Sequence, residues 1–232
     1  MITGASSGIG RATAIAFAKA GIDIALVSRQ KDRLESVAKE ARNLGVEAKA
    51  FPLDLAKVEQ VHTQIDSIVA AFGPVNILVN NAGMGYTGHL IETSLADWQK
   101  VIDLNLTSVF QCIKGVLPGM RDQGSGTIIN VVSIAGLKVF PNWGAYCVSK
   151  FGLMALSKTL NIEERANGIR VTALCPGSVN TPIWDSETVK ADFDRSAMLT
   201  PEIVAESILY VALLPTSAVI EELTLMPSVG TF

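Results

Sequence analysis

The sequence predicts an α/β fold with a doubly wound parallel sheet that helices cover on both faces. Three observations predict it. Short apolar runs alternate along the chain with longer segments of helical periodicity, which is the order of βαβ units. Several apolar runs lack polar alternation, as strands covered on both faces do. A glycine-rich turn near the N-terminus leads directly into a helical segment. Together these features are typical of a three-layer Rossmann fold, and the 232 residues suit a single domain, 1–232.

Six apolar runs are the expected strands. After a first strand at the N-terminus, they cover 24–28, 48–53, 75–80, 127–133, 169–175 and a weaker run at 223–226. The first strand is expected to be short, because only Met1, Ile2 and Thr3 precede the glycine-rich turn. A strand usually has about 5–6 residues, so we expect that a few strand residues are absent ahead of Met1.

The helical segments lie between these strands. They are expected at 8–20, 31–44, 57–72, 95–121, 143–167 and 201–214. In the first, Ile9, Ala12, Ala16 and Ala20 can share one face. Four of the segments are followed by a glycine that can end a helix, namely Gly21, Gly45, Gly73 and Gly168.

Composition excludes several classes of function. A net charge of -3 and the lack of any Lys/Arg run argue against nucleic-acid binding. No apolar run approaches the ~20 residues that span a bilayer, and the N-terminus lacks the pattern of a signal peptide. Cys112, Cys147 and Cys175 form neither a zinc pattern nor a redox pair, and His62 and His89 stand alone. We therefore expect a cytoplasmic protein without metal, membrane or nucleic-acid partners, whose cysteines are buried hydrophobes.

The stretch "MITGASSGIG" has the composition of a phosphate-binding loop. Gly4 would form the turn, Gly8 would let the backbone approach a pyrophosphate, and Gly10 would let the helix pack against the sheet. Backbone N–H groups at the start of the helix would then face the phosphates. The alternative interpretation is a flexible, glycine-rich N-terminus. The position of the stretch before a helix of small residues favours the phosphate loop.

The residues after the second expected strand bear on the choice of dinucleotide. A carboxylate at this position binds the ribose hydroxyl of NAD, whereas an Arg accommodates the additional phosphate of NADP. Here Ser28 and Arg29 occupy the position, and the next carboxylate is Asp32. Arg29 can offer a bidentate fork to a phosphate. The sequence thus favours NADP(H), with NAD(H) as the second option; the alternative is that Arg29 is a solvated side chain.

Later in the chain, Ser133, Tyr146 and Lys150 suggest acid–base chemistry. Tyr146 and Lys150 are four positions apart, on one face of an expected helix. A Tyr hydroxyl has a pKa of ~10 and is a poor base at neutral pH, whereas a neighbouring ammonium favours its anion. Ser133 is expected at the end of a strand, where ligands bind in an open parallel sheet, and could donate a hydrogen bond to a carbonyl.

Six motifs then occur in one order: "TGASSGIG", "NNAG" at 80–83, "DLN" at 103–105, Ser133, "YCVSK" at 146–150 and "PG" at 176–177. In this order and spacing the chain resembles the short-chain dehydrogenase/reductase family, in its single-domain branch. Its front half resembles the 3-ketoacyl-carrier-protein reductases and related carbonyl reductases. The resemblance implies an NAD(P)-dependent oxidoreductase that acts on CH–OH groups and transfers a hydride between the nicotinamide and a carbonyl or secondary alcohol.

The resemblance also implies roles for individual residues. Tyr146 would be the general acid/base, and Lys150 would lower its pKa and hold the nicotinamide ribose. Ser133 would orient the substrate carbonyl or hydroxyl, and Asn105 would support a proton-relay water. The expected cofactor contacts, including those of the phosphate loop, are Gly4, Ser6, Ser7, Gly8, Ile9, Gly10, Ser28, Arg29, Asp54, Leu55, Asn81, Ala82, Gly83, Tyr146, Lys150, Pro176, Gly177, Val179 and Thr181.

The substrate pocket is expected among apolar residues near the nicotinamide. The candidates are Met84, Ile134, Val139, Phe140, Trp143 and Trp184. They favour an apolar or aromatic carbonyl compound or an acyl chain, although some of them could serve only to pack the helices. The resemblance implies that segment 182–199, which contains Trp184, is a substrate-covering loop, because family members have such a loop at this place. The chain departs from the family at its end, where "ELTLMPSVGTF" stands in place of a glycine-rich tail. This departure argues against the fatty-acid assignment and against the family's contact between subunit tails.

The resemblance further implies self-association. The expected helices at 95–121 and 143–167 resemble the pair through which the family dimerises, so a homodimer or homotetramer is expected. A competing reading is a catalytically silent sensor or scaffold that binds NADP(H). Another is an epimerase or dehydratase of the longer branch of the family. The presence together of Ser133, Tyr146, Lys150 and Asn105 favours the enzyme.

Overall fold

A seven-stranded sheet forms the centre of the protein in a computed structural model that describes residues 1–191 and 194–230. The strand order is β3-β2-β1-β4-β5-β6-β7, and every pair is parallel. The order reverses between β1 and β4, which is the switch point where such sheets bind ligands. The strands are β1 (Ile2–Thr3), β2 (Ile24–Ser28), β3 (Ala48–Pro52), β4 (Ile77–Asn80), β5 (Gly126–Val131), β6 (Ile169–Pro176) and β7 (Glu222–Leu225).

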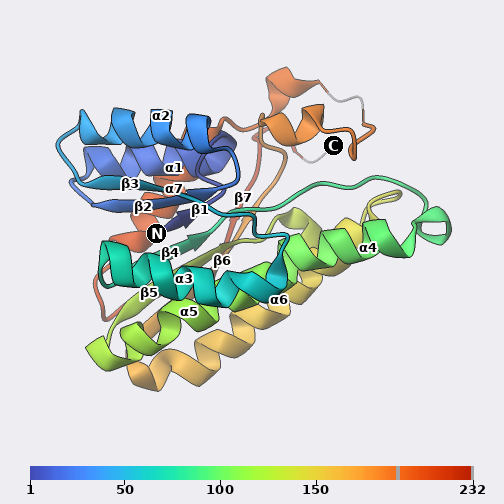
Figure 1. The fold of residues 1–232 in the computed structure, drawn as a ribbon. Coiled ribbons are helices and arrows are strands. Elements are labelled where there is room, and N and C mark those ends of the chain that lie inside the picture. Colours follow the sequence, from blue (N-terminus) through green and yellow to red (C-terminus); the bar gives the residue numbers. More distant parts are fainter. Residues whose placement is uncertain (192–193, 231–232) are drawn as a thin grey trace.

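Helices cover both faces of the sheet (Figure 1). One layer contains α1 (Gly8–Lys19), α2 (Lys31–Arg42) and α7 (Pro201–Ala212). The other contains α3 (Val58–Phe72), α5 (Ser108–Gln123) and α6 (Gly144–Glu164), with α4 (Leu95–Ile102) leading into α5. The fold is therefore the three-layer α/β arrangement that the sequence predicts.

The strands are apolar throughout because their two faces enter two different cores. In β2, Leu26 packs with the residues of α1, α2 and α7, whereas its neighbour Val27 packs with those of α3, α5 and α6. Ile128 and Ile129 of β5 divide in the same way. Successive side chains of a strand point to opposite faces, so a sheet buried on both sides needs apolar residues at every position.

The first strand is short, as predicted, and is paired on both sides. Ile2 pairs with Leu26 of β2 and with Val79 of β4. The amino group of Met1 donates a hydrogen bond of 2.7 Å to the carbonyl oxygen of Ile77. Two residues thus suffice to place the glycine-rich turn at the switch point of the sheet.

The helical stretch predicted at 95–121 is present, but the structure divides it into consecutive segments. A π-helical turn, Asp103–Thr107, lies between α4 and α5, and the Ser108 N–H bonds the Asp103 carbonyl five residues earlier. Asn105 lies in this wider turn, where it is fully buried. Hydrophobic periodicity continues across such a turn, so the pattern did not reveal it.

The face suggested for the first helix is only partly the buried one. Ala12 is buried together with Gly10, Thr13, Ala14, Phe17 and Ala18, whereas Ala20 is exposed. A helix of mostly small apolar residues offers several faces of similar hydrophobicity. The large ring of Phe17 decides between them, since its burial excludes the most apolar area from water.

The remaining boundaries differ by a few residues at most. Strand β5 ends at Val131 instead of Ser133, and α6 ends at Glu164, followed by a 3-10 turn to Asn167. The four glycines that were expected to end helices all have positive φ. The cysteines are buried and unpaired. In the described part of the chain, no helix has the length and apolarity to cross a membrane, and no acidic, His or Cys side chains gather as metal ligands.

Candidate active site

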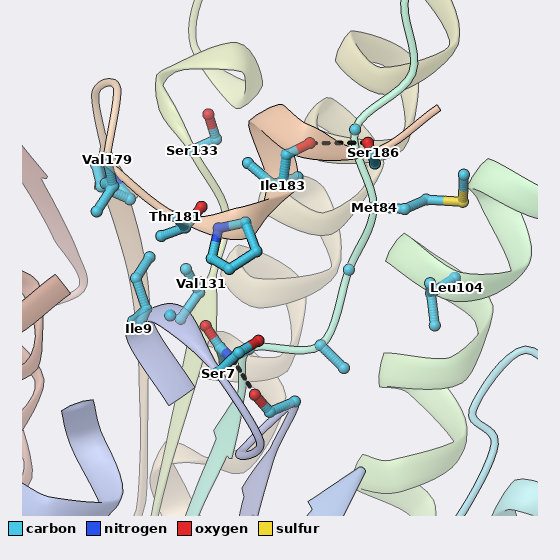
Figure 2. Close-up of a pocket in the computed structure, with 18 of the residues that line it drawn as sticks. Ser7, Ile9, Met84, Leu104, Val131, Ser133, Val179, Thr181, Ile183 and Ser186 are labelled. Carbon is cyan, nitrogen blue, oxygen red and sulfur yellow. Dashed lines mark hydrogen bonds between the residues drawn. The ribbon is translucent and has the colours of Figure 1, made fainter. Parts of the chain in front are cut away.

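A cavity of about 580 Å³ opens at the carboxyl ends of the strands. It is lined by the segments that follow β1, β2, β4, β5 and β6, which lie on either side of the switch point. Figure 2 shows Ser7 and Ile9 of the glycine-rich turn near one end, and Ser133, Ile183 and Ser186 near the other. One ligand bound in this cavity could therefore contact both the glycine-rich turn and the residues after β5.

The glycines of the turn are required by its geometry. Gly4 and Gly8 have φ of 65° and 52°, which favour glycine. A Cβ on Gly10 would overlap the carbonyl oxygen of Gly4, so α1 can approach the turn only without a side chain there. Gly8 faces Thr181, whose Cγ2 would lie 3.2 Å from an added Cβ. The turn therefore forms a cradle of bare backbone at the N-terminus of α1, whose first N–H groups have no acceptor within the helix.

Asn81 anchors this cradle to the next strand. Its Nδ2 donates to the Thr3 carbonyl at 3.0 Å, and its backbone N–H donates to the Thr3 hydroxyl at 3.0 Å. The Ala82 N–H donates to the same hydroxyl at 3.1 Å. Asn81, Ala82 and Gly83 line the cavity beside the turn. These bonds fix the spacing between β1 and β4 where the sheet opens.

The end of β2 lies at one extremity of the cavity. Ser28 and Arg29 line it, and the Ser28 and Ser6 hydroxyls are 2.7 Å apart. Arg29 is exposed, with its Nε 4.0 Å from Asp54 Oδ1. Asp54 itself does not line the cavity, although Leu55 does. Sequence reasoning missed Arg33, which lies one helical turn beyond Arg29 and also lines the cavity; its i+4 spacing was the available signal.

Ser133, Tyr146 and Lys150 line the same cavity. Desolvation raises the pKa of Tyr146 to about 12, and a hydrogen bond with the Ser133 side chain acts in the opposite direction. Burial lowers the pKa of Lys150 to about 8. The Lys150 ammonium donates to the Val131 carbonyl at 3.0 Å and lies 5.7 Å from the centroid of the Tyr146 ring. Desolvation therefore disfavours the charged form of each group.

Ser133 has an unusual backbone conformation for a residue with a side chain, with φ of 131°. It follows β5 by two residues and precedes the 3-10 turn Ile134–Gly136, and its hydroxyl accepts a hydrogen bond of 3.1 Å from the Ala135 N–H. A Cβ on Gly136 would lie 2.9 Å from the Lys150 carbonyl, so this turn packs closely on α6. Strained backbone of this kind is frequent at functional sites.

Asn105 does not line the cavity but connects the elements around it. Its Oδ1 accepts a bond of 2.8 Å from the Met84 N–H, and its Nδ2 donates to the Met84 carbonyl at 2.9 Å. The same Nδ2 donates to the Ser149 hydroxyl at 3.1 Å, which in turn donates to the Tyr146 carbonyl at 2.7 Å. The Asn105 amide is thus occupied in linking the π-helical turn to α6. Sequence reasoning did not single out Ser149.

The predicted substrate residues separate into two groups. Met84, Ile134, Phe140, Trp143 and Trp184 line the cavity near Tyr146. Val139 does not line it and is 74% exposed, because it lies in the loop that runs over the surface before α6. Sequence reasoning did not name Gly85, which also lines the cavity, and it gave Pro182, Ile183 and Ser186 only as part of the covering segment 182–199.

The segment 182–199 covers this end of the cavity and is held there by hydrogen bonds; residues 192 and 193 lie outside the described part. Thr188 Oγ1 donates to the Gly85 carbonyl at 2.7 Å, and the Thr87 N–H donates to the Thr188 carbonyl at 2.8 Å. Arg195 bonds Asp185 at 2.6 Å and the carbonyl of Thr181 at 3.1 Å. The segment is therefore tied both to the loop after β4 and to the loop after β6.

The expected cofactor residues mostly meet in this one place. Lining the cavity are Gly4, Ser6, Ser7, Gly8, Ile9, Ser28, Arg29, Leu55, Asn81, Ala82, Gly83, Tyr146, Lys150, Pro176, Gly177, Val179 and Thr181. Two expected cofactor residues do not line the cavity: Gly10 packs against the Gly4 carbonyl, and Asp54 lies 4.0 Å from Arg29. Asn105, expected to support the proton relay, also lies outside the lining and bonds Met84.

Comparison with known proteins agrees with this arrangement. A model of the family described as short chain dehydrogenase matches residues 1–192. The 3-oxoacyl-[acyl-carrier-protein] reductase FabG of Thermotoga maritima is 34% identical over 218 residues, which are 91% of this chain and 89% of that protein. The glycine betaine reductase ATRR of Emericella nidulans is 35% identical, and the match covers 98% of this chain but 18% of that longer protein.

Among solved structures, an alcohol dehydrogenase from the archaeon Thermococcus sibiricus, complexed with 5-hydroxy-NADP, has a TM-score of 0.89 and 33% identity. The alignment covers 98% of this chain and 95% of that one. The family match extends over the glycine-rich turn and the Ser133, Tyr146 and Lys150 group. This chain belongs to the short chain dehydrogenase family and is an oxidoreductase that acts on carbonyl and alcohol groups.

Proposed function

We propose that the protein is an NADP(H)-dependent oxidoreductase that transfers a hydride between the nicotinamide and an uncharged carbonyl compound or secondary alcohol. The observation that carries the proposal is that one cavity joins the glycine cradle at α1 to Ser133, Tyr146 and Lys150. A dinucleotide has its phosphates in the middle and its reactive ring at one end, and the cavity offers partners for both.

The residues present fit this cofactor. Gly4 and Gly8 present bare backbone to the cavity. An added Cβ on Gly4 or Gly10 would collide with the turn or with Asn81, so the cradle keeps its shape only with glycine at these positions. At the far end, two guanidinium groups, those of Arg29 and Arg33, line the cavity without a lining carboxylate. Guanidinium groups recognise phosphates, which supports a preference for NADP(H) over NAD(H). The NADP analogue bound by the Thermococcus sibiricus relative supports the same preference.

Proton transfer is assigned to Tyr146. In the reductive direction its hydroxyl gives a proton to the substrate oxygen, and in the oxidative direction it takes one back. When bound, the nicotinamide supplies or accepts the hydride, and its oxidised form adds a positive charge close to the phenol. Lys150 holds the cofactor ribose and adds its own positive charge when protonated, which favours the Tyr146 anion.

The other residues of the group position the reactants. The Ser133 hydroxyl, already a hydrogen-bond partner of Tyr146, orients the substrate oxygen. Asn105 acts through the Ser149 hydroxyl on the first turn of α6, where Tyr146 lies, and through Met84 on the wall of the pocket. We assign to Asn105 the support of the proton relay through this placement.

We further propose that two copies associate through the exposed faces of α5 and α6. Phe110 of α5 and Phe151 and Ile162 of α6 are exposed, and exposed large apolar side chains favour association. Light scattering coupled to size-exclusion chromatography measures the assembly. A mass of 24.6 kDa at all concentrations would contradict this proposal.

The reaction is tested by mixing the protein with NADPH or NADH and a panel of ketones, aldehydes and secondary alcohols, while the absorbance of the reduced nicotinamide is followed. Turnover with NADPH that exceeds turnover with NADH is expected. Tight binding of NADPH without turnover on the whole panel would indicate a sensor or scaffold instead. A clear preference for NADH would contradict the role of Arg29 and Arg33.

A further inference from the structure

Three aromatic rings meet at the substrate end of the cavity. Trp143 packs edge to face against Tyr146, with centroids 5.4 Å apart, and against Trp184, with centroids 5.9 Å apart. Trp143 immediately precedes α6, one turn before Tyr146, and Trp184 is fixed by a bond of 2.8 Å from its indole N–H to the Val179 carbonyl. We call Trp143 and Trp184 the tryptophan wall. Both line the cavity beside the proposed proton donor.

Behind this wall, the loop after β4 meets the covering segment. A Cβ on Gly85 would lie 2.6 Å from Val189 Cγ2 and 3.5 Å from both Ile183 Cγ1 and Trp143 Cζ3. The loop after β4 and the covering segment therefore touch there, and the Thr188 bonds to Gly85 and Thr87 hold them together. A long acyl chain could leave the pocket on this side only by breaking these contacts. These contacts limit the room for a long chain on this side of the wall.

Among the described residues that line the same end of the cavity, Lys150 is the one cationic side chain, and no arginine lies there. The cationic side chains that line the cavity are Arg29 and Arg33 at the opposite end and Lys150, whose ammonium bonds the Val131 carbonyl. Ser186, opposite Ser133 in Figure 2, donates its hydroxyl to the Ile183 carbonyl at 2.8 Å. A carboxylate or phosphate on the substrate would be desolvated there without compensation.

We propose that the tryptophan wall selects compact, uncharged aromatic ketones and aldehydes, and the corresponding benzylic alcohols, over linear aliphatic or acyl compounds. The inference rests on the proposed function. The carbonyl carbon accepts a hydride from NADPH, the C=O π bond breaks, and the oxygen takes the Tyr146 proton, so that the alcohol and NADP⁺ are the products. The aromatic ring of the substrate packs on the indoles, where aromatic pairs gain more than their buried area alone provides.

The test uses three ketones with NADPH: acetophenone, cyclohexyl methyl ketone as its saturated counterpart, and 2-octanone as a linear one. For the wild type we expect the highest kcat/KM with acetophenone. Trp143→Leu and Trp184→Leu are expected to lower the ratio of acetophenone to cyclohexyl methyl ketone by about two- to tenfold, as the loss of one aromatic pair implies. Trp143→Phe keeps a ring and is expected to keep most of the ratio. Tyr210→Leu, at an exposed position of α7, is the matched control and should leave the ratio unchanged.

The outcomes separate this inference from the proposed function. Turnover of none of these ketones and of no compound of the wider panel would overturn the proposed function, whereas turnover of other panel compounds without acetophenone would overturn the tryptophan wall alone. Reduction of 2-octanone at least as well as acetophenone, or an unchanged ratio in both leucine variants, would overturn the tryptophan wall while the proposed function stands. NADPH binding and the melting temperature of each variant are measured as well. If Trp143→Leu does not fold, Trp184→Leu and Trp143→Phe carry the decision.

Discussion

Burial disfavours the two charged forms that the proposed chemistry uses, the Tyr146 phenolate and the Lys150 ammonium. Desolvation raises the pKa of the phenol to about 12 and lowers that of the ammonium to about 8, and the Ser133 hydrogen bond is the influence that favours the phenolate. Shifting a pKa by one unit corresponds to about 1.4 kcal/mol, so a base at neutral pH requires several kcal/mol of added stabilisation. The positive charge of an oxidised nicotinamide beside the pair would supply part of it.

Tyr146→Phe removes the proton donor and keeps the ring that Trp143 packs against. Turnover is expected to fall to background, because no other described hydroxyl that lines the cavity has a comparable place beside Lys150. NADPH affinity is expected to remain within a few-fold, since the cradle is unchanged. Titration by nucleotide fluorescence and a turnover assay measure the two effects separately. Full activity in the variant would contradict the assignment of Tyr146.

The Lys150 shift also predicts a pH dependence of stability. Between pH 8 and 10.5 the Lys150 side chain is protonated more in the unfolded chain than in the folded one. Its contribution to the free energy of unfolding therefore rises with pH across that window. Lys150→Met lacks this contribution. The free energy of unfolding of the wild type relative to Lys150→Met should therefore increase by about 3 kcal/mol over the window. Urea titrations at several pH values measure it, and a constant difference would contradict the burial of the ammonium.

At the scale of elements, the sequence predicts best where geometry demands one residue type. The glycines of the turn could be identified because only glycine fits their backbone, and the same is true of the helix-ending Gly21 and Gly168. The π-helical turn at Asn105 could not, because its residues keep the apolar pattern of a regular helix. Ser149 escaped notice for a similar reason, since a buried serine in a helix has no sequence signal until its partners are known.

Gly10→Ala tests the packing of α1 on the glycine-rich turn. Because the added methyl would overlap the Gly4 carbonyl, the turn has to shift away from the helix, and overpacking of this kind costs about 1–3 kcal/mol. NADPH binding should weaken strongly, as the shift moves the cradle. Gly119→Ala in α5 is the matched control: its Cβ would meet nothing within 4 Å, so the change should be neutral or stabilising. Thermal melts and nucleotide titrations compare the two variants, and equal effects would refute the close approach at Gly10.

At the scale of the whole molecule, the site exists because the sheet reverses its order between β1 and β4. The reversal separates the loops after these strands and leaves a cavity that no single element could form. Alternation of apolar and helical segments predicts this architecture from sequence. It does not predict which wall residue faces inward: Val139 and Phe140 are neighbours, yet Phe140 alone lines the cavity. Both residues lie in the loop before α6, which the Gly88 N–H ties to the loop after β4 through the Asn142 carbonyl at 2.7 Å, a contact that the sequence does not reveal.

Because the cavity joins the segments after five strands, a ligand that fills it should stabilise the whole fold. At a concentration of 100 times Kd, a ligand that binds only the folded state adds about 2.7 kcal/mol, and in a chain of this length each kcal/mol raises Tm by about 2–4 °C. NADPH is therefore expected to raise Tm by about 5–11 °C at that excess. NADH at equal concentration should give a smaller shift, because it lacks the phosphate that Arg29 and Arg33 would bind. In a variant with both arginines changed to Ala, the two shifts should converge. Scanning calorimetry measures all four values, and a larger shift with NADH in the wild type would contradict the placement of the phosphate at the end of β2.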